Sequence, residues 1–206
     1  MTTLYLVRHA ETEWHHDNRY AGHTDIQLTE FGHQQATGLI PWIKAVNPNV
    51  IASSDSLRAK DTARPLAESL GKDLVIEPRF REVNFGEIEG LTPDEMLVQY
   101  PELRAAFLLN PADAKMPGGE SGREAVSRAL PGLIELLARK DNEIVVVVCH
   151  GTLMRLLTCS LLGINLNEYR RTFPMIPNIG RIALQVDRIQ QESNSTPTAI
   201  FLELIT

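Results

Sequence analysis

Short apolar runs alternate along this chain with segments in which apolar residues recur every three or four positions. The runs with the length and β-branched content of buried strands lie at residues 4–7, 50–52, 74–76 and 144–149. The segments with helical spacing lie at about 29–46, 56–70 and 121–137. Two late strands are expected at 182–186 and 200–204. This alternation predicts an α/β fold, with a mainly parallel central sheet flanked by helices on both faces.

Residues that typically begin or interrupt helices define the ends of the predicted helices more closely. Thr29 is a typical N-cap for the first helix, and Gly71 is placed to end the helix at 56–70. Pro41 should kink the first helix or shift its start, and Pro65 should break the second, because proline removes a backbone donor and crowds the preceding turn. Gly163 is expected to end an apolar helix that follows the strand at 144–149.

Residues from about 78 to 120 interrupt this regular order. They begin as a glycine-bearing, acidic loop and continue into two short helices, one before Pro101 and one after it. Long loops in compact domains usually carry function. We therefore expect one domain over residues 1–206 with an insertion at about 78–120, called the cap below, that selects the substrate.

Composition narrows the class of protein. With 206 residues, 43% of them hydrophobic, the chain can bury one substantial core. Its net charge of −6 without a basic tail disfavours a nucleic-acid or anionic-membrane partner. No apolar run is long enough to span a membrane and no secretory leader follows Met1, so the cytoplasm is the expected compartment. The sequence leaves a homodimer open.

Candidate chemistry gathers where the predicted strands end. Arg8 and His9 follow the first strand, His150 follows the strand at 144–149, and Arg58 comes shortly after the strand at 50–52. Open α/β sheets bind ligands at the carboxyl ends of their strands. Two permanent cations and two imidazoles, together with the loop carboxylate Glu82, suffice to bind a phosphate and cleave its ester without a metal ion. We therefore expect a small phosphorylated substrate and no cofactor.

Several motifs in one order make the chain resemble the histidine phosphatase superfamily, in the branch that contains cofactor-dependent phosphoglycerate mutases and small phosphatases. The segments that carry the resemblance are residues 6–12, 28–36, 53–63, 81–90, 117–121 and 148–151. The resemblance implies that His9 is the phosphorylated nucleophile and that Glu82 is the proton donor. It also implies that Arg8, Arg58 and His150 hold the phosphoryl oxygens.

The chain departs from the family pattern at three places near the predicted nucleophile. Ala10 stands where glycine is usual, His15 where asparagine is usual, and Ala21 where glutamine is common. We expect activity to survive Ala10 and the pocket to be altered at the other two. The residues expected to bind substrate are Thr12, His15, Ala21, Gly22 and Gly151. The longer insertion that mutases carry after the Glu82 region is missing, which favours a phosphatase over a mutase.

Other interpretations stay open at this stage. Glu87 or Glu89 could replace Glu82 as the acid. A metal site could be built from His15, His16, Asp17, His23 and His33, although adjacent histidines on an irregular segment usually face apart. Cys149 and Arg155 match the spacing of cysteine-dependent phosphatases, but Thr152 replaces the glycine that this pattern requires, and Arg155 reads as a helix residue. A phosphoglycerate mutase and a phospho-ligand binding module without turnover are the alternative functions.

Overall fold

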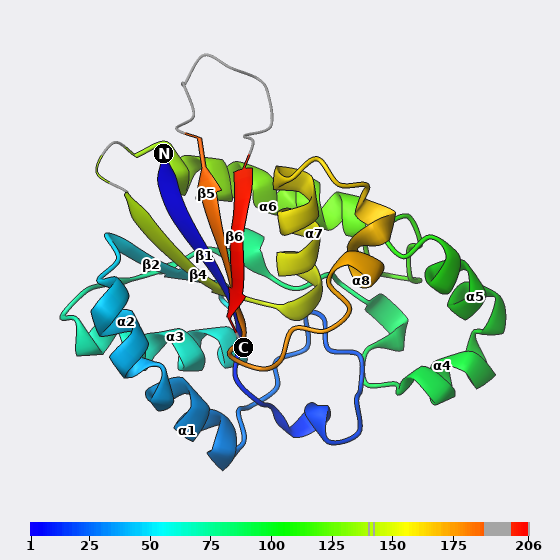
Figure 1. The fold of residues 1–206 in the computed structure, drawn as a ribbon. Coiled ribbons are helices and arrows are strands. Elements are labelled where there is room, and N and C mark those ends of the chain that lie inside the picture. Colours follow the sequence, from blue (N-terminus) through cyan, green and yellow to red (C-terminus); the bar gives the residue numbers. More distant parts are fainter. Residues whose placement is uncertain (140, 142, 188–198, 206) are drawn as a thin grey trace.

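A mixed six-stranded sheet forms the centre of the computed structural model, which describes residues 1–139, 141, 143–187 and 199–205 (Figure 1). Its strands are β1 (Thr2–Arg8), β2 (Val50–Ser53), β3 (Leu74–Ile76), β4 (Ile144–Cys149), β5 (Arg181–Val186) and β6 (Ala199–Ile205). They lie in the order β3-β2-β4-β1-β5-β6. The first four are mutually parallel, and β5 runs antiparallel to both β1 and β6. The predicted α/β fold is confirmed.

The central position of β1 follows from its side chains, which are apolar toward both faces of the sheet. Leu4 and Leu6 pack into the core on one face, whereas Tyr5 and Val7 pack on the other. The parallel register with β4 pairs Arg8 with Cys149. The residues that follow these two strands therefore leave the sheet side by side at one edge.

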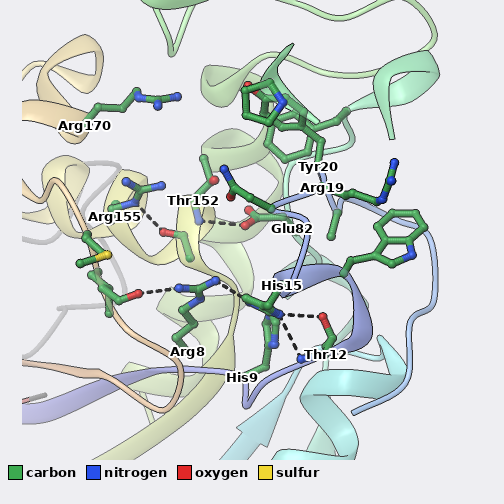
Figure 2. A pocket seen from close by; sticks show the side chains of 18 of the residues that line it. Arg8, His9, Thr12, His15, Arg19, Tyr20, Glu82, Thr152, Arg155 and Arg170 are labelled. Atoms are coloured by element: carbon green, nitrogen blue, oxygen red, sulfur yellow. Dashed lines mark hydrogen bonds between the residues drawn. The ribbon is translucent and has the colours of Figure 1, made fainter. Parts of the chain in front are cut away.

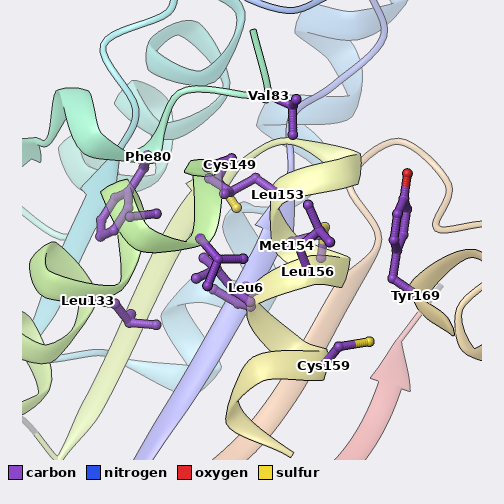
Figure 3. Packing of buried hydrophobic residues seen from close by; sticks show 14 of the residues in the cluster. Leu6, Phe80, Val83, Leu133, Cys149, Leu153, Met154, Leu156, Cys159 and Tyr169 are labelled. Carbon is purple, nitrogen blue, oxygen red and sulfur yellow. The ribbon is translucent and has the colours of Figure 1, made fainter. Parts of the chain in front are cut away.

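Helices cover both faces of the sheet. One face carries α2 (Ile40–Val46) and α3 (Leu57–Ser69), with α1 (Glu30–Gly38) packed against α3, and the other carries α6 (Gly122–Leu137) and α7 (Gly151–Leu161). Leu133 of α6 and Leu153 and Leu156 of α7 pack against the β1 face that holds Leu6, as Figure 3 shows. Burial of these apolar side chains is the dominant favourable contribution to folding.

The cap extends away from the sheet as two short helices, α4 (Pro93–Gln99) and α5 (Pro101–Leu109) (Figure 1). A capping box between Thr92 and Glu95 starts α4. Near the cap lies α8 (Tyr169–Thr172), which contacts α7. Single 3₁₀ turns occur at Glu13–His15, Pro78–Phe80, Gly86–Ile88 and Leu166–Glu168.

Most of the expected helix bounds are confirmed, with one correction. Thr29 accepts a hydrogen bond from Gly32 N and caps α1, and Pro41 lies in the first turn of a separate helix, α2. Pro65 does not break α3, contrary to expectation, because Ala63 and Leu66 are fully buried on either side of it and this packing holds the helix together. Residues 188–198, between the last two strands, lie outside the described residues. None of the described helices is long and apolar enough to cross a membrane.

Candidate active site

Side chains from four separate parts of the chain meet at the carboxyl edge of the parallel strands. His9 follows β1, His150 follows β4, and their ring centroids are 5.3 Å apart. His15, in the 3₁₀ turn after β1, places its ring centroid 5.5 Å from that of His9. Arg58 comes from the first turn of α3, and Glu82 from the segment leading into the cap. The predicted convergence of strand ends therefore exists.

His9 is held in a single tautomer. Its Nδ1 lies 2.7 Å from the backbone oxygen of Ala10, and a carbonyl can only accept, so Nδ1 carries the proton. Nε2 therefore keeps its lone pair. Burial lowers the pKa of His9 well below its ordinary value, and the positive charges of Arg58 and Arg8 lower it further. The ring is thus a neutral, oriented nucleophile around neutral pH.

Arg8 lies next to His9 and is fixed at both ends of its guanidinium group. Nη1 donates to the backbone oxygen of Ile176 (2.6 Å), and Nη2 donates to Nε2 of His15 (2.7 Å) (Figure 2). Burial lowers the pKa of Arg8 to about 10. A Cβ at Gly151 would lie 3.2 Å from Arg8 Nε, so the glycine gives the guanidinium room at the start of α7.

Arg58 and His150 are fully buried beside these groups. Arg58 donates from Nη1 to the backbone oxygen of Thr24 (2.9 Å) and from Nη2 to that of Gly22 (2.7 Å). Nε2 of His150 lies 2.9 Å from Oγ of Ser54.

Three buried nitrogens of this group have no hydrogen-bond partner among the described residues: Arg8 Nε, Arg58 Nε and His150 Nδ1. A buried donor without an acceptor costs about 1–3 kcal/mol, and more where it is charged. Two guanidinium groups with an unused buried N–H each, beside an imidazole nitrogen without a partner, are suited to an anion that brings several acceptor oxygens, as a phosphate does.

Glu82 lies at the N-terminus of α7. Oε2 accepts from Thr152 N (2.8 Å), and Oε1 accepts from Leu153 N (2.8 Å) and Val83 N (2.9 Å). Oε1 is saturated by two donors, whereas Oε2 has one and can still exchange a proton. Glu82 therefore faces the cavity with one usable oxygen.

The two alternative acids lie elsewhere. Glu89 accepts from the backbone N–H groups of His23, Thr24 and Phe85 and so ties two loops together. Glu87 is exposed and accepts from the hydroxyl of Tyr100 (3.3 Å). Neither lines the cavity that contains His9, whereas Glu82 does.

A cavity of about 330 Å³ opens over His9. Seven of the predicted site residues line it: Arg8, His9, Thr12, His15, Ala21, Glu82 and Gly151. Arg58 and His150 lie buried outside this lining, and Gly22 does not reach it either. A Cβ at Gly22 would come within 2.6 Å of the backbone oxygen of Val83, so this glycine allows close packing and offers its carbonyl to Arg58.

Sequence reasoning missed a second group of cavity residues. Arg19, Arg104, Arg155 and Arg170 also line it, together with the aromatic side chains of Trp14, Tyr20, Phe85, Phe107 and Tyr169. The sequence indicates Arg155 only as a helix residue. No local pattern marks these arginines, because they come from four different segments that meet only in the folded chain.

The alternative metal and thiolate sites find no geometric support in the described part of the chain. His16 is exposed beside Asp17, His23 lies 3.9 Å from Glu120, and no group of three or more potential ligands among the described residues could hold a metal ion. Cys149 is fully buried, which raises the pKa of its thiol, and it does not line the cavity. A thiolate nucleophile at Cys149 is therefore disfavoured.

Comparison with known proteins places this chain in a family. The model of the histidine phosphatase superfamily (branch 1) matches residues 4–195. The chain belongs to this superfamily. The expected resemblance is confirmed, and so is the expectation that the chain is an enzyme of the histidine phosphatase type.

Relatives within the superfamily carry both phosphatase and mutase names. Phosphoserine phosphatase 1 of Hydrogenobacter thermophilus is 36% identical over 169 residues, which cover 82% of this chain and 80% of the relative. A protein of Erwinia tasmaniensis named "Probable phosphoglycerate mutase GpmB" is 32% identical over 171 residues, covering 83% of this chain and 80% of its own. The solved structure of a mycobacterial glucosyl-3-phosphoglycerate phosphatase superposes with a TM-score of 0.86 at 27% identity, covering 98% of this chain and 97% of that one.

Proposed function

We propose that this enzyme hydrolyses a small phosphate monoester through a phosphohistidine at His9, without a metal ion. The observation that carries the proposal is the hydrogen bond from Nδ1 of His9 to the backbone oxygen of Ala10, which leaves Nε2 as a neutral nucleophile. The phosphatase names of Phosphoserine phosphatase 1 and of the mycobacterial phosphatase support a hydrolytic reaction.

In the first step, Nε2 of His9 attacks phosphorus and the bond from phosphorus to the ester oxygen breaks. The leaving oxygen takes a proton from Oε2 of Glu82, which enters this step as the carboxylic acid and leaves it as the carboxylate; Oε2 is the oxygen with only one N–H contact. Arg8 and Arg58 neutralise charge on the phosphoryl oxygens, and His150 donates from Nδ1.

In the second step, water attacks the phosphohistidine and gives its proton to Glu82. The nitrogen–phosphorus bond breaks, inorganic phosphate leaves, and both residues return to their starting protonation states. Each step thus uses groups already fixed by the fold, which is the positioning that phosphoryl transfer requires.

Trapping the intermediate tests this function. Wild type and His9→Ala are incubated with ³²P-labelled phosphate esters in EDTA and quenched in alkaline detergent, because the nitrogen–phosphorus bond is labile to acid. We expect label on wild-type protein only, and phosphate release from p-nitrophenyl phosphate by wild type only. Phosphate release that persists in His9→Ala would contradict the proposal.

A phosphoglycerate mutase is the second candidate, because several relatives are named so at 31–32% identity. In that reaction the phosphoryl group on His9 returns to a hydroxyl of the substrate instead of to water. The same incubation with phosphoglycerates distinguishes the two functions. Interconversion of phosphoglycerates that is faster than phosphate release would assign the mutase.

A further inference from the structure

Three of the arginines that line the cavity are not used by the phosphoryl chemistry. Arg104 comes from α5 in the cap, Arg155 from α7 and Arg170 from α8. We call them the outer arginines. Figure 2 shows Arg155 and Arg170 on the same side of the cavity, across from Arg19 and Tyr20 and beyond the level of His9. Nη1 of Arg104 donates to the hydroxyl of Tyr20 (3.1 Å), so Arg104 faces the other two from the opposite side.

The outer arginines lack acidic partners. In the described part of the chain, no carboxylate lies within ion-pair distance of Arg104, Arg155 or Arg170. Arg19, which lines the same cavity, differs in this respect, since it pairs with Asp17 (3.3 Å) and Glu95 (3.2 Å). The outer arginines therefore hold positive charge that the protein itself does not compensate.

The charge of the cavity contrasts with that of the whole chain. Among the described residues, five arginines line the cavity and Glu82 is its one carboxylate, whereas the chain as a whole has a net charge of −6. A phosphate ester brings about two negative charges at neutral pH. Arg8 and Arg58 already match these two charges, so the outer arginines exceed what the phosphoryl group alone requires.

Aromatic side chains hold two of these arginines in place. The guanidinium of Arg155 lies over the ring of Tyr169 (4.9 Å to the centroid), and that of Arg170 lies over Phe107 (5.1 Å). Nε of Arg155 also donates to the backbone oxygen of Gly151 (2.8 Å). Nη1 of Arg155 donates to the backbone oxygens of Phe173 (3.3 Å) and Pro174 (3.5 Å), so Nη2 is the nitrogen of Arg155 left for a ligand. A guanidinium that stacks on a ring presents its remaining N–H groups sideways, toward a carboxylate or phosphate.

We propose that the outer arginines bind a second anionic group, a carboxylate or a second phosphate, of the same substrate whose phosphoryl group reacts at His9. This inference rests on the proposed phosphatase function and narrows its substrate class to acidic phosphate esters. The cavity of about 330 Å³ is at the small end of ligand sites, so the second anion belongs to a small metabolite.

Pairs of esters that differ by one acidic group test this specificity. We would compare 3-phosphoglycerate with glycerol 3-phosphate, and fructose 1,6-bisphosphate with fructose 6-phosphate, so that one pair reports on a carboxylate and the other on a second phosphate. The wild type should favour the acidic member of at least one pair in kcat/KM by about 10-fold or more, as expected for charge-assisted hydrogen bonds. p-Nitrophenyl phosphate reports hydrolysis independently of a second anion.

Three single variants, Arg104→Met, Arg155→Met and Arg170→Met, remove the outer charges while keeping the length of the side chain. Each should lower kcat/KM for the acidic member more than for the neutral member, so that the ratio falls toward 1. Arg171→Met is the matched control, because Arg171 neighbours Arg170 on α8, is 86% exposed and pairs with Glu168. It should leave the ratio unchanged.

The outcomes separate the two proposals. If wild type hydrolyses p-nitrophenyl phosphate and both members of every pair equally well, the second anion site is wrong and the phosphatase function stands. A preference that survives in all three variants would also overturn the assignment to the outer arginines. If wild type hydrolyses nothing in the panel, the proposed phosphatase function itself fails.

Discussion

Nη2 of Arg8 donates to Nε2 of His15 over 2.7 Å, so the histidine that replaces the family's usual asparagine fixes the guanidinium beside the nucleophile. Asn178 Nδ2 also lies 3.1 Å from the same Nε2, and Nδ1 lies 2.8 Å from Oγ1 of Thr12, which can accept its N–H. A neutral ring with its proton on Nδ1 therefore satisfies both contacts, because Nε2 keeps the lone pair that accepts from Arg8. A protonated His15 would direct an N–H at the guanidinium, so this site favours the neutral ring.

His15 is accordingly expected to position Arg8 rather than to take part in the chemistry. His15→Ala should raise the inhibition constant of inorganic phosphate by about 10-fold, because one end of Arg8 loses its acceptor. His15→Asn should restore much of the affinity, since the amide oxygen can accept from Arg8. His16→Ala is the control, because the His16 side chain is 95% exposed. Equal phosphate affinity in His15→Ala and wild type would show that Arg8 needs no such support.

Stability should fall as the solution becomes acidic. Burial lowers the pKa of His15 from 6.5 to about 4 and lowers those of His9 and His150 well below 6.5. Between those values and 6.5 the unfolded chain binds more protons than the native chain, so the free energy of unfolding decreases as pH drops from about 6.5 toward 4. Calorimetric Tm values across this range measure the effect.

A variant of His15 tests whether this residue contributes to the pH dependence of stability. His15→Asn removes one of the three groups, so its Tm should depend less steeply on pH than that of wild type. His16→Asn, at a side chain that is 95% exposed, controls for the substitution itself. If His15→Asn and wild type gave parallel curves, His15 would not be a source of the acid sensitivity.

Much of the fold and of the inner site could be predicted because the signals are local. An apolar run that is followed directly by Arg8 and His9, or by His150, indicates both a strand and the end of that strand at which the ligand binds. The capping residue Thr29 and the turn before α4 are equally local. The antiparallel direction of β5 was not predictable in this way, since strand direction depends on how the preceding loop returns to the sheet.

The outer arginines show why the rest could not be predicted. Arg104, Arg155 and Arg170 lie on helices that are adjacent only after the cap and α8 have packed against α7. In the linear chain each resembles a solvated helix residue. Likewise, the contacts of Arg58 with the backbone oxygens of Gly22 and Thr24 join segments with no shared pattern.

Replacing Glu82 by glutamine should affect rate and stability for different reasons. The loss of the exchangeable proton should slow turnover by a factor of about 10² to 10⁴ for alkyl phosphates and by less for p-nitrophenyl phosphate, whose leaving group needs no proton. The amide NH₂ of the new glutamine would face the N–H of Thr152, or those of Leu153 and Val83, and two donors cannot hydrogen-bond to each other. This should lower the free energy of unfolding by about 1–3 kcal/mol. Kinetics with both esters and urea unfolding separate the effects.

Glu87→Gln provides the comparison for that experiment, because Glu87 is exposed and outside the cavity. It should retain wild-type rates with both esters. Equal rate losses of Glu82→Gln on good and poor leaving groups would remove Glu82 from the role of proton donor.

Restoring the family's glycine at residue 10 should change stability more than activity. Ala10 is fully buried and packs with Leu28 and Ala36, away from the cavity lining. Ala10→Gly removes one buried methyl group and gives the unfolded chain more freedom, so a loss of about 1–2 kcal/mol is expected. Urea unfolding and the turnover rate with p-nitrophenyl phosphate test this. Turnover that becomes about ten times faster or more would show that the methyl group restricts His9.

Cys149 tests whether the chemistry depends on a thiol. Its side chain is fully buried in the main core, and burial raises the pKa of the thiol, so a thiolate does not form at neutral pH (Figure 3). Cys149→Ala should retain activity within about 3-fold while losing about 1 kcal/mol of stability for the sulfur contacts removed from the core. Iodoacetamide should not inactivate the native wild type. Loss of turnover in a folded Cys149→Ala, with label absent from His9 in wild type, would instead identify a thiol mechanism.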